Sequence, residues 1–247
     1  STIASFQSNN MKFLNLKGFS RNEISGGNDF VAVYDLPQNT SEPAHLSAID
    51  TSTLISRNPD IVHIDAAHRQ GLIHHGAWIL LIDSNQKLLM LKRGPQLITC
   101  PNSWSPMGEH RLRYESIIDT VKRGMNEELG PIVWRRYVKR AGNLTSLPLY
   151  YIRDYGEANE NRVDRQVTWI YHVQLKSPGE TVGNVMNLDS EVADWGWFGV
   201  NEIEEWLQRT PDDFCHETIV QMLKISLDSL GESLKRHDQV NIRAEIE

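Results

Sequence analysis

Apolar residues recur at helical spacing in the middle of the chain. From Glu115 onward they occupy positions 117, 118, 121, 125 and 129, which gives a helix one buried face. Gly130 and Pro131 follow and are expected to end this helix. Its last turn carries Glu127 and Glu128, where the helix dipole disfavours negative charge. This pair costs stability unless a cation or a basic group faces it, so we predict a metal at this end of the helix.

Short apolar segments before and after this helix predict strands. They cover 30–36, 61–64, 77–82 and 87–92 before it, with the last two forming a hairpin, and 147–153, 167–175 and 195–198 after it. The segment 49–58 is ambiguous, and Pro59 is expected to end it. Residues 132–140 are strand or irregular, and 178–187 form a loop. Asn201 can cap a helix running to about 208, and an apolar stripe predicts a final helix over 211–234. The predicted class is α+β with a mixed sheet.

Three segments are expected along the chain. Residues 1–28 form a polar N-terminal extension, and 29–207 form the main domain. Residues 208–247 form a helix that packs on this domain, followed by a charged tail. The long apolar stripe of the helix covers the core or pairs with a second chain, which would make a homodimer.

Composition favours a soluble globular protein. The chain has 247 residues, 40% of them hydrophobic, and a formal net charge of -7. An acidic balance argues against a general binder of nucleic-acid polymers or acidic membranes, since those depend on basic surface. We find no apolar run long enough to span a membrane and no convincing signal peptide. Cys100 and Cys215 lie far apart without a CxxC pattern, so neither a disulfide framework nor a cysteine zinc site is indicated, and we expect a cytoplasmic location.

The stretch 104–130, WSPMGEHRLRYESIIDTVKRGMNEELG, resembles the Nudix box, G-x5-E-x7-R-E-U-x-E-E-x-G-U, where U is a bulky aliphatic residue. The residues in register with it are Glu115, Arg123, Met125, Glu127, Glu128 and Gly130. The resemblance implies a Nudix α/β/α sandwich over 29–207, with an added C-terminal helix. It also implies a Mg²⁺ or Mn²⁺ ion held by Glu127 and Glu128.

Two positions of the box depart from the family pattern. The family glycine should lie at Glu109, although Gly108 stands next to it, and the glutamate of the Arg-Glu pair is Gly124. Gly124 and Glu128 are i, i+4 neighbours on one helix face. A metal site that normally draws on both carboxylates has therefore lost one.

Further segments resemble Nudix proteins related to type 1 isopentenyl-diphosphate isomerase. Residues 68–75, HRQGLIHH, are similar to their H-R-x-G-L-x-H-R signature, 188–197 resemble their D-x-E-V-x-x-x-x-W element, and 101–104 resemble P-G-x-W. Carried over residue by residue, the metal ligands of these isomerases fall at His68, His74, His110 and Asp164. The partner of Asp164 falls at Gln166, a poor ligand. The isomerase cysteine should lie at Gly108.

Several other side chains are candidates for the site. Arg93, Arg162 and Arg165 have the planar guanidinium that grips a diphosphate, and we expect Trp104 and Trp169 to face the ligand. Glu127, Glu128 and Asp164 are the expected catalytic carboxylates. With the usual candidate missing at Gly124, Asp164 or Glu115 would replace the general base.

The leading hypothesis is a metal-dependent hydrolase that cleaves a diphosphate linked to another moiety, in a nucleoside diphosphate derivative or an isoprenyl-type diphosphate. Its partner would be this small molecule, with no nucleic-acid polymer and no membrane involved. The alternative is a catalytically impaired module that binds a diphosphate or a protein. Isomerase is disfavoured, because Gly108 and Gln166 stand where the acid and base of that reaction are needed.

Overall fold

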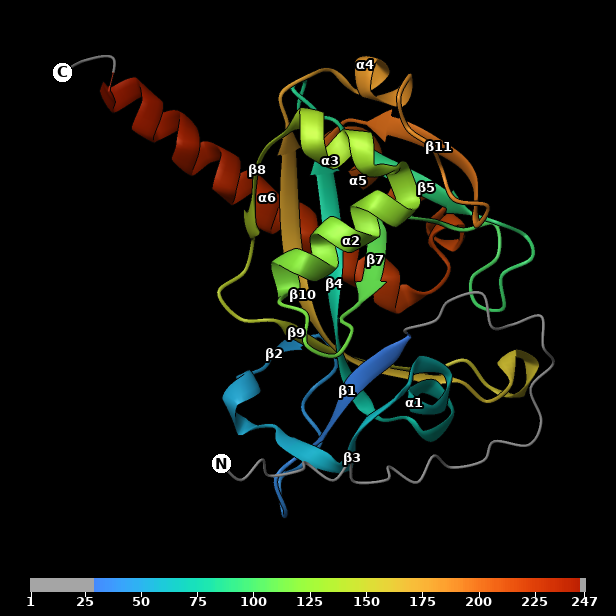
Figure 1. The fold of residues 1–247 in the computed structure, drawn as a ribbon. Coiled ribbons are helices and arrows are strands. Elements are labelled where there is room, and N and C mark those ends of the chain that lie inside the picture. Colours follow the sequence, from blue (N-terminus) through green and yellow to red (C-terminus); the bar gives the residue numbers. More distant parts are fainter. Residues whose placement is uncertain (1–28, 245–247) are drawn as a thin grey trace, which may run out of the picture.

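The computed structural model describes residues 29–244, so the polar extension expected over 1–28 lies outside the described residues. A twisted mixed sheet forms the centre of the molecule (Figure 1). Its long strands β4 (Ile73–Ile82) and β10 (Val163–Leu175) run parallel, while every other pairing in this part of the chain is antiparallel. The order across the sheet is β11, β5, β4, β10, β9 and β2.

The remaining strands extend this sheet. They are β1 (Phe30–Asp35), β2 (Ser47–Ala48), β3 (Ile55–His63), β5 (Leu88–Arg93), β6 (Trp104–Ser105), β7 (Met107–His110), β8 (Val138–Asn143), β9 (Leu149–Asp154) and β11 (Val192–Phe198). β7 pairs with β4 and places Glu109 opposite Ala77 and His110 opposite Gly76. The strand that carries part of the Nudix-like box thus lies directly against the central strand of the sheet.

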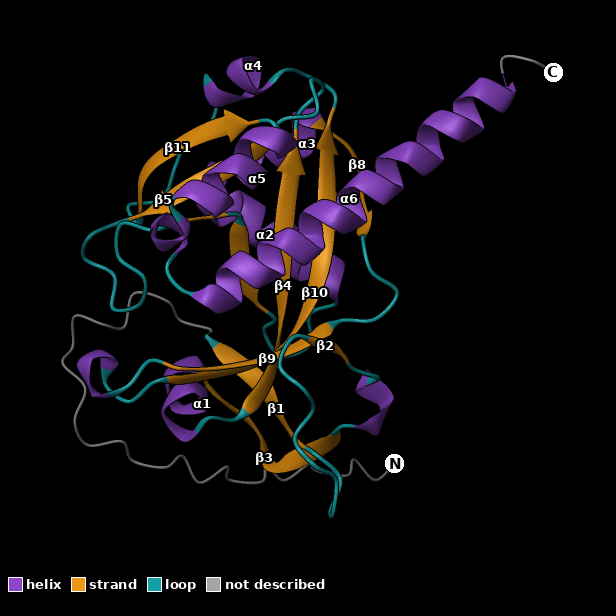
Figure 2. Ribbon diagram, turned by 180° about the vertical axis from the view of Figure 1, so that it is seen from behind, coloured by secondary structure: helices purple, strands orange, loops and turns teal. Residues whose placement is uncertain are grey.

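Helices cover both faces of the sheet. α2 (Ile117–Leu129) and α3 (Pro131–Tyr137) lie in front of β4 and β10 in Figure 1, and α5 (Val200–Arg209) and α6 (Glu217–Ala244) cross the other face in Figure 2. Alternate side chains of β4 serve the two faces: Ala77, Ile79 and Leu81 pack under α2, and Trp78, Leu80 and Ile82 pack under α5 and α6. The predicted α+β class and α/β/α arrangement are confirmed.

A smaller layer at one end of the sheet positions the first histidine. α1 (Ile64–Gln70) follows β3 and ends at Gly71, whose left-handed φ of 58° terminates the helix. Ala67 and Leu72 pack with Val31 and Val33 in a separate small core. This packing fixes the last turn of α1, which carries His68, against the start of β4.

Four local expectations were wrong, each for a physical reason. Pro59 lies inside β3, because this strand pairs only with β1 and Pro59 falls where their register is irregular. The stretch 132–140, expected to be strand or irregular, is helix α3 as far as Tyr137, since the fixed φ of Pro131 suits a first helical position, and only its end belongs to β8. Residues Gly179–Gly183 form the short helix α4 and not loop. The final helix begins at Glu217, because Cys215 has a φ of 71° and leaves Pro211–Phe214 as a separate short turn.

The expectation of no disulfide was also wrong. Cys100 and Cys215 are bonded, across a sequence separation of 115 residues. The fold brings the loop after β5 to the start of α6, so residues that are distant in sequence come within 5.1 Å between Cα atoms. No helix within the described residues is long and apolar enough to cross a membrane.

Candidate active site

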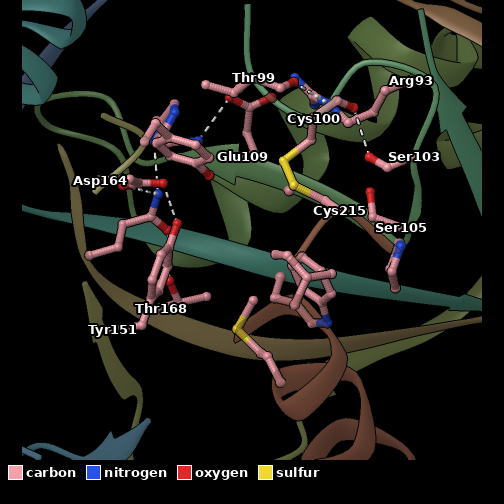
Figure 3. A pocket seen from close by; sticks show the side chains of 18 of the residues that line it. Arg93, Thr99, Cys100, Ser103, Ser105, Glu109, Tyr151, Asp164, Thr168 and Cys215 are labelled. Carbon is pink, nitrogen blue, oxygen red and sulfur yellow. Dashed lines mark hydrogen bonds between the residues drawn. A yellow bond between two sulfur atoms is a disulfide. The ribbon is translucent and has the colours of Figure 1, made fainter. Parts of the chain in front are cut away.

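A cavity of about 200 Å³ opens between the sheet, the loop 94–103 and the start of α6 (Figure 3). Its polar wall comes from α1, β7, β9 and β10, and its apolar wall from Trp78, Trp104, Ile219 and Met222. Its polar lining residues include His68, Arg93, Glu109, His110, Tyr151, Arg162, Asp164 and Gln166. The disulfide of Cys100 and Cys215 forms part of the wall of this cavity (Figure 3).

Three histidines meet beside this cavity. His68 from α1, His74 from β4 and His110 from β7 have ring centroids 5.1 to 5.2 Å apart, and one nitrogen from each lies within 4.8 Å of the others. Asp164 on β10 places Oδ1 3.5 Å from Nε2 of His74 and 3.7 Å from Nε2 of His68. Four side chains from four elements thus converge, as the resemblance implied.

The proton positions on two of these rings follow from their partners. Nδ1 of His74 lies 3.0 Å from the carbonyl oxygen of Leu72, which can only accept, so Nδ1 carries the proton and Nε2 presents a lone pair. Nδ1 of His68 lies 2.5 Å from Nη2 of Arg162, which can only donate. The proton of neutral His68 is therefore on Nε2, the nitrogen that faces Asp164.

Burial keeps His68 and His110 neutral at physiological pH. It lowers the pKa of His68 to about 4, although the charge of Asp164 partly opposes it. It lowers the pKa of His110 well below the usual value, and the neighbouring His74 and His68 add to this effect. Neutral imidazole is the form that binds metals, so the site is poised to receive a cation.

Asp164 is held by neighbours that do not neutralise it. The hydroxyl of Tyr151 donates to its Oδ2, and burial raises the pKa of that phenol well above its usual value, so the hydroxyl keeps its proton. Nε2 of Gln166 lies 3.3 Å from Oδ1 of Asp164 and 3.2 Å from Nδ1 of His110. Gln166 thus connects Asp164 to His110 by hydrogen bonds.

The box helix is organised by Arg123. α2 begins with a capping box between Ser116 and Asp119. Arg123 donates from Nε to Glu115 at 2.8 Å and from Nη2 to the carbonyl oxygen of His110 at 2.6 Å. Nη1 contacts Glu127 at 2.9 Å and Glu109 at 3.1 Å. This one guanidinium fixes β7 and the loop before α2 onto the helix.

Two partly buried carboxyl groups, those of Glu109 and Glu128, have strongly raised pKa values. Burial raises the pKa of Glu109 to about 7, with Arg123 partly opposing it. Burial also raises the pKa of Glu128 to about 7, and the charge of Glu109 is the next largest cause. Burial alone would raise the pKa of Glu115 too, but Arg123 and the hydrogen bonds from Leu112 and Thr120 together more than offset this, and the pKa is lowered. Glu115 therefore serves as a structural anion.

The predicted site residues divide into two groups. Those that line the cavity are His68, His110, Asp164, Arg93, Arg162 and Trp104, with His74 directly behind them. The charges of Glu109 and Arg93 both affect the pKa of Glu128. The side chain of Glu127 is 58% exposed and forms an ion pair with Arg123. Neither glutamate lines the cavity.

Two predicted ligand contacts lie elsewhere. Arg165 pairs with Glu42 and donates to the hydroxyl of Tyr150, outside the cavity. Trp169 follows Thr168, which does line the cavity, so the alternation of the strand turns Trp169 to the opposite face of the sheet.

Sequence reasoning missed Glu109, Tyr151 and the disulfide as parts of the cavity. Glu109 was available in the sequence as an acid at a position where the box has glycine, but its direction depends on how β7 pairs with β4. Tyr151 was visible only as part of a tyrosine-rich strand. The cysteine pair gave no local signal at all.

The residues present fit a divalent metal. Nε2 of both His68 and His74 is buried and makes no hydrogen bond within the described part of the chain. Such orphaned atoms cost stability, and a metal bound to them removes that cost. Three imidazoles and a carboxylate suit a transition metal such as Zn²⁺ or Mn²⁺, whereas carboxylates alone suit Mg²⁺.

Comparisons with known proteins agree with these features. A family model described as the NUDIX domain matches residues 72–222, more than half of the chain. The isopentenyl-diphosphate Delta-isomerase of Burkholderia multivorans is 28% identical over 150 residues, covering 60% of this chain and 75% of that protein.

The chain is also similar to solved structures. They include a Deinococcus radiodurans protein at TM-score 0.49, with 11% identity over 73% of this chain and 98% of the other. A NUDIX hydrolase from Nitrosomonas europaea gives TM-score 0.42, with 14% identity over 64% of this chain and 88% of the other. The E. coli dihydroneopterin triphosphate pyrophosphohydrolase gives TM-score 0.45, with 11% identity over 62% and 94%. These likenesses are too low in score and identity to support a function.

Proposed function

Because this chain belongs to the Nudix family, we propose that it is a divalent-metal-dependent hydrolase that cleaves a diphosphate joined to another group. The observation that carries the proposal is the composition of one cavity. Metal-type donors, His68, His110 and Asp164, line the same space as the guanidinium groups of Arg93 and Arg162. A diphosphate needs both cations and a metal to offset its charge.

The metal would neutralise phosphate oxygens and activate a water molecule for attack. His74 is oriented to hold it, since its free lone pair is on Nε2 and its Nδ1 donates a hydrogen bond to the carbonyl oxygen of Leu72. His68 offers Nε2 only if its proton moves to Nδ1, where Arg162 now donates. We expect metal loading to release Arg162 from His68, which makes its guanidinium available to phosphate oxygens.

The other arginine is positioned from the cavity edge. Nε of Arg93 donates to the carbonyl oxygen of Thr99, 3.1 Å away, which anchors the guanidinium beside loop 94–103.

In the reaction, the water oxygen bonds to one phosphorus, the bond from that phosphorus to the leaving oxygen breaks, and one water proton must be taken up. Asp164 is the proposed acceptor, because it lines the cavity and its Tyr151 and Gln166 partners orient it.

The apolar wall bears on the group attached to the diphosphate. Trp78, Trp104 and Met222 supply flat or flexible apolar contacts at the other side of the same cavity. A planar base or an isoprenyl chain suits this wall, and a second highly charged group does not. The proposed substrates are therefore nucleoside diphosphate derivatives and isoprenyl-type diphosphates.

A test measures release of inorganic phosphate or nucleotide from a panel of both substrate classes, with Mg²⁺, with Mn²⁺ and after chelation. We expect turnover of at least one compound that disappears with the metal. Asp164→Asn should lower kcat about 100-fold or more. Tight binding of a panel compound without metal-dependent turnover would instead establish a binding module.

Isomerisation is the second candidate, favoured by the similarity to the Burkholderia multivorans protein. The site argues against it. Gly108 lines the cavity where the cysteine would be needed, Gln166 is engaged with His110, and Cys100 is in a disulfide. No conversion between the two five-carbon diphosphate isomers is expected under conditions in which hydrolysis is measured.

A further inference from the structure

The two departures from the box meet in space. A Cβ atom built on Gly124 would lie 3.1 Å from both Cγ and Oε2 of Glu109, and 3.2 Å from its Cβ. The side chain of Glu109 therefore occupies the volume that any side chain at position 124 would enter. The acid at one unusual position fills the space left by the glycine at the other.

A glycine in the interior of α2 has a cost that this arrangement explains. Glycine destabilises a helix interior by about 1 kcal/mol relative to alanine. Gly124 is buried in the middle of α2, flanked by the buried Met125, and its φ is not in the left-handed region. Its backbone geometry does not require glycine, so the requirement comes from the close approach of Glu109.

The carboxyl group of Glu109 is held in a defined position. Its Oε1 lies 3.1 Å from Nη1 of Arg123 and accepts the backbone N–H of His110 at 3.0 Å. Its side chain is 17% exposed, against 58% for Glu127 on the same guanidinium. Glu109 also lines the cavity, which Glu115 and Glu127 do not.

An ion pair with Arg123 does not by itself account for Glu109. Arg123 carries one positive charge and already contacts Glu115 through two nitrogens and Glu127 through a third. With Glu109, three carboxyl groups face this one guanidinium, which leaves an excess of negative charge in a half-buried setting. A divalent cation bound by carboxylate oxygens would offset that excess.

We propose that Glu109 supplies from β7 the metal-binding carboxylate that the box helix lacks at Gly124. The use of this metal in catalysis rests on the proposed function, whereas its binding does not. In this site the metal-binding carboxylate comes from the strand β7 and not from the helix α2.

The test is calorimetric titration of the whole chain with Mg²⁺, which prefers oxygen ligands and so reports on the carboxylates more than on the histidines. Glu109→Gln should weaken Mg²⁺ binding about 10- to 100-fold. Gly124→Glu alone should also weaken it, because its side chain collides with Glu109. The double variant Glu109→Gly with Gly124→Glu should return the affinity to within about threefold of wild type.

The control is Glu205→Gln on α5, which removes an exposed carboxylate paired with Arg209 and should leave Mg²⁺ binding unchanged. Circular dichroism and urea denaturation establish that each variant is folded, and Glu109→Gln keeps the size of the side chain in case Glu109→Gly does not fold. Wild-type affinity in folded Glu109→Gln would overturn the proposal, as would a folded double variant that fails to recover. Loss and recovery of Mg²⁺ binding without turnover in any protein would overturn the proposed function and leave this inference standing.

Discussion

Nε2 of His74 lies 3.5 Å from Oδ1 of Asp164, while Nδ1 of the same ring donates a hydrogen bond to the carbonyl oxygen of Leu72. The side chain of His74 is fully buried, and Nε2 has no hydrogen-bond partner within the described residues. A buried lone pair that faces a carboxylate gains nothing from that neighbour and is expected to be completed by a cation.

Replacing His74 by glutamine should therefore remove a ligand. We expect affinity for Zn²⁺ or Mn²⁺ to fall about 10- to 100-fold, as measured by metal content after dialysis against a buffered metal. His45→Gln is the matched control, since His45 is exposed. Equal metal content in wild type and His74→Gln would show that the histidines do not form the site.

Arg123 is expected to be the most sensitive charged residue in the box. Its side chain is 21% exposed and contacts Glu109, Glu115 and the carbonyl oxygen of His110. Removing one partner of such a network leaves the others desolvated and uncompensated. Arg123→Ala should lower the free energy of unfolding by about 2 to 4 kcal/mol in urea denaturation.

An exposed arginine gives the contrast for this measurement. Arg209 pairs with Glu205 at the surface of α5, where both side chains are more than half exposed. Surface pairs contribute little, so Arg209→Ala should change the unfolding free energy by less than about 1 kcal/mol. Similar losses in the two variants would contradict the central role given to Arg123.

The disulfide should contribute to both stability and substrate binding. It closes a loop with a sequence separation of 115 residues, and native bridges of this kind stabilise by about 2 to 4 kcal/mol. Reduction should lower the urea midpoint of wild type and raise KM, because Cys100 follows Thr99, the anchor of Arg93. In a Cys100→Ser, Cys215→Ser variant, reductant should have no effect. An unchanged midpoint after full reduction of wild type would refute the expectation.

His216 predicts a dependence of stability on pH. Burial lowers its pKa to about 4, with Arg153 as the next cause, whereas the unfolded chain titrates near 6.5. Between these values the unfolded state binds a proton that the folded state does not. The free energy of unfolding therefore decreases as pH falls from about 6.5 toward 4. Because the ring is only partly buried, the effect should be on the order of 1 kcal/mol.

The variant that checks this sign is His216→Gln, which keeps a polar side chain without the titration. Its unfolding free energy relative to wild type should rise as the pH is lowered from 7 to 4.5, in parallel urea titrations. A constant difference between the two proteins across this range would rule out the buried neutral histidine.

The fold followed from the sequence where one face of an element is buried. Alternation and helical spacing located β4, β10 and α2, because each of them packs against a continuous apolar layer. The errors fall where a single residue decides the backbone: Pro131 starts a helix, and Cys215 adopts a positive φ. Such decisions depend on tertiary contacts that a local pattern does not contain.

The site was predictable in its residue types and less so in its geometry. His68, His74, His110 and Asp164 converge as the resemblance implied. Arg165 was misplaced because its partner, Glu42, is more than a hundred residues away in the chain, and pairing between distant segments leaves no trace in a local pattern. The contact between Glu109 and Gly124 could not be predicted for the same reason, since it depends on the approach of β7 to α2.

The contact between Glu109 and Gly124 also bears on how relatives of this chain are identified. A position-by-position comparison counts two defects in the box, while in the folded protein the side chain at the first position fills the space beside the second. Sequences that carry an acid at the first position and glycine at the second should therefore occur together as a distinct subgroup. If the two positions are scored as a pair, boxes with an acid on the strand opposite the glycine can be told apart from boxes that have only lost the glutamate.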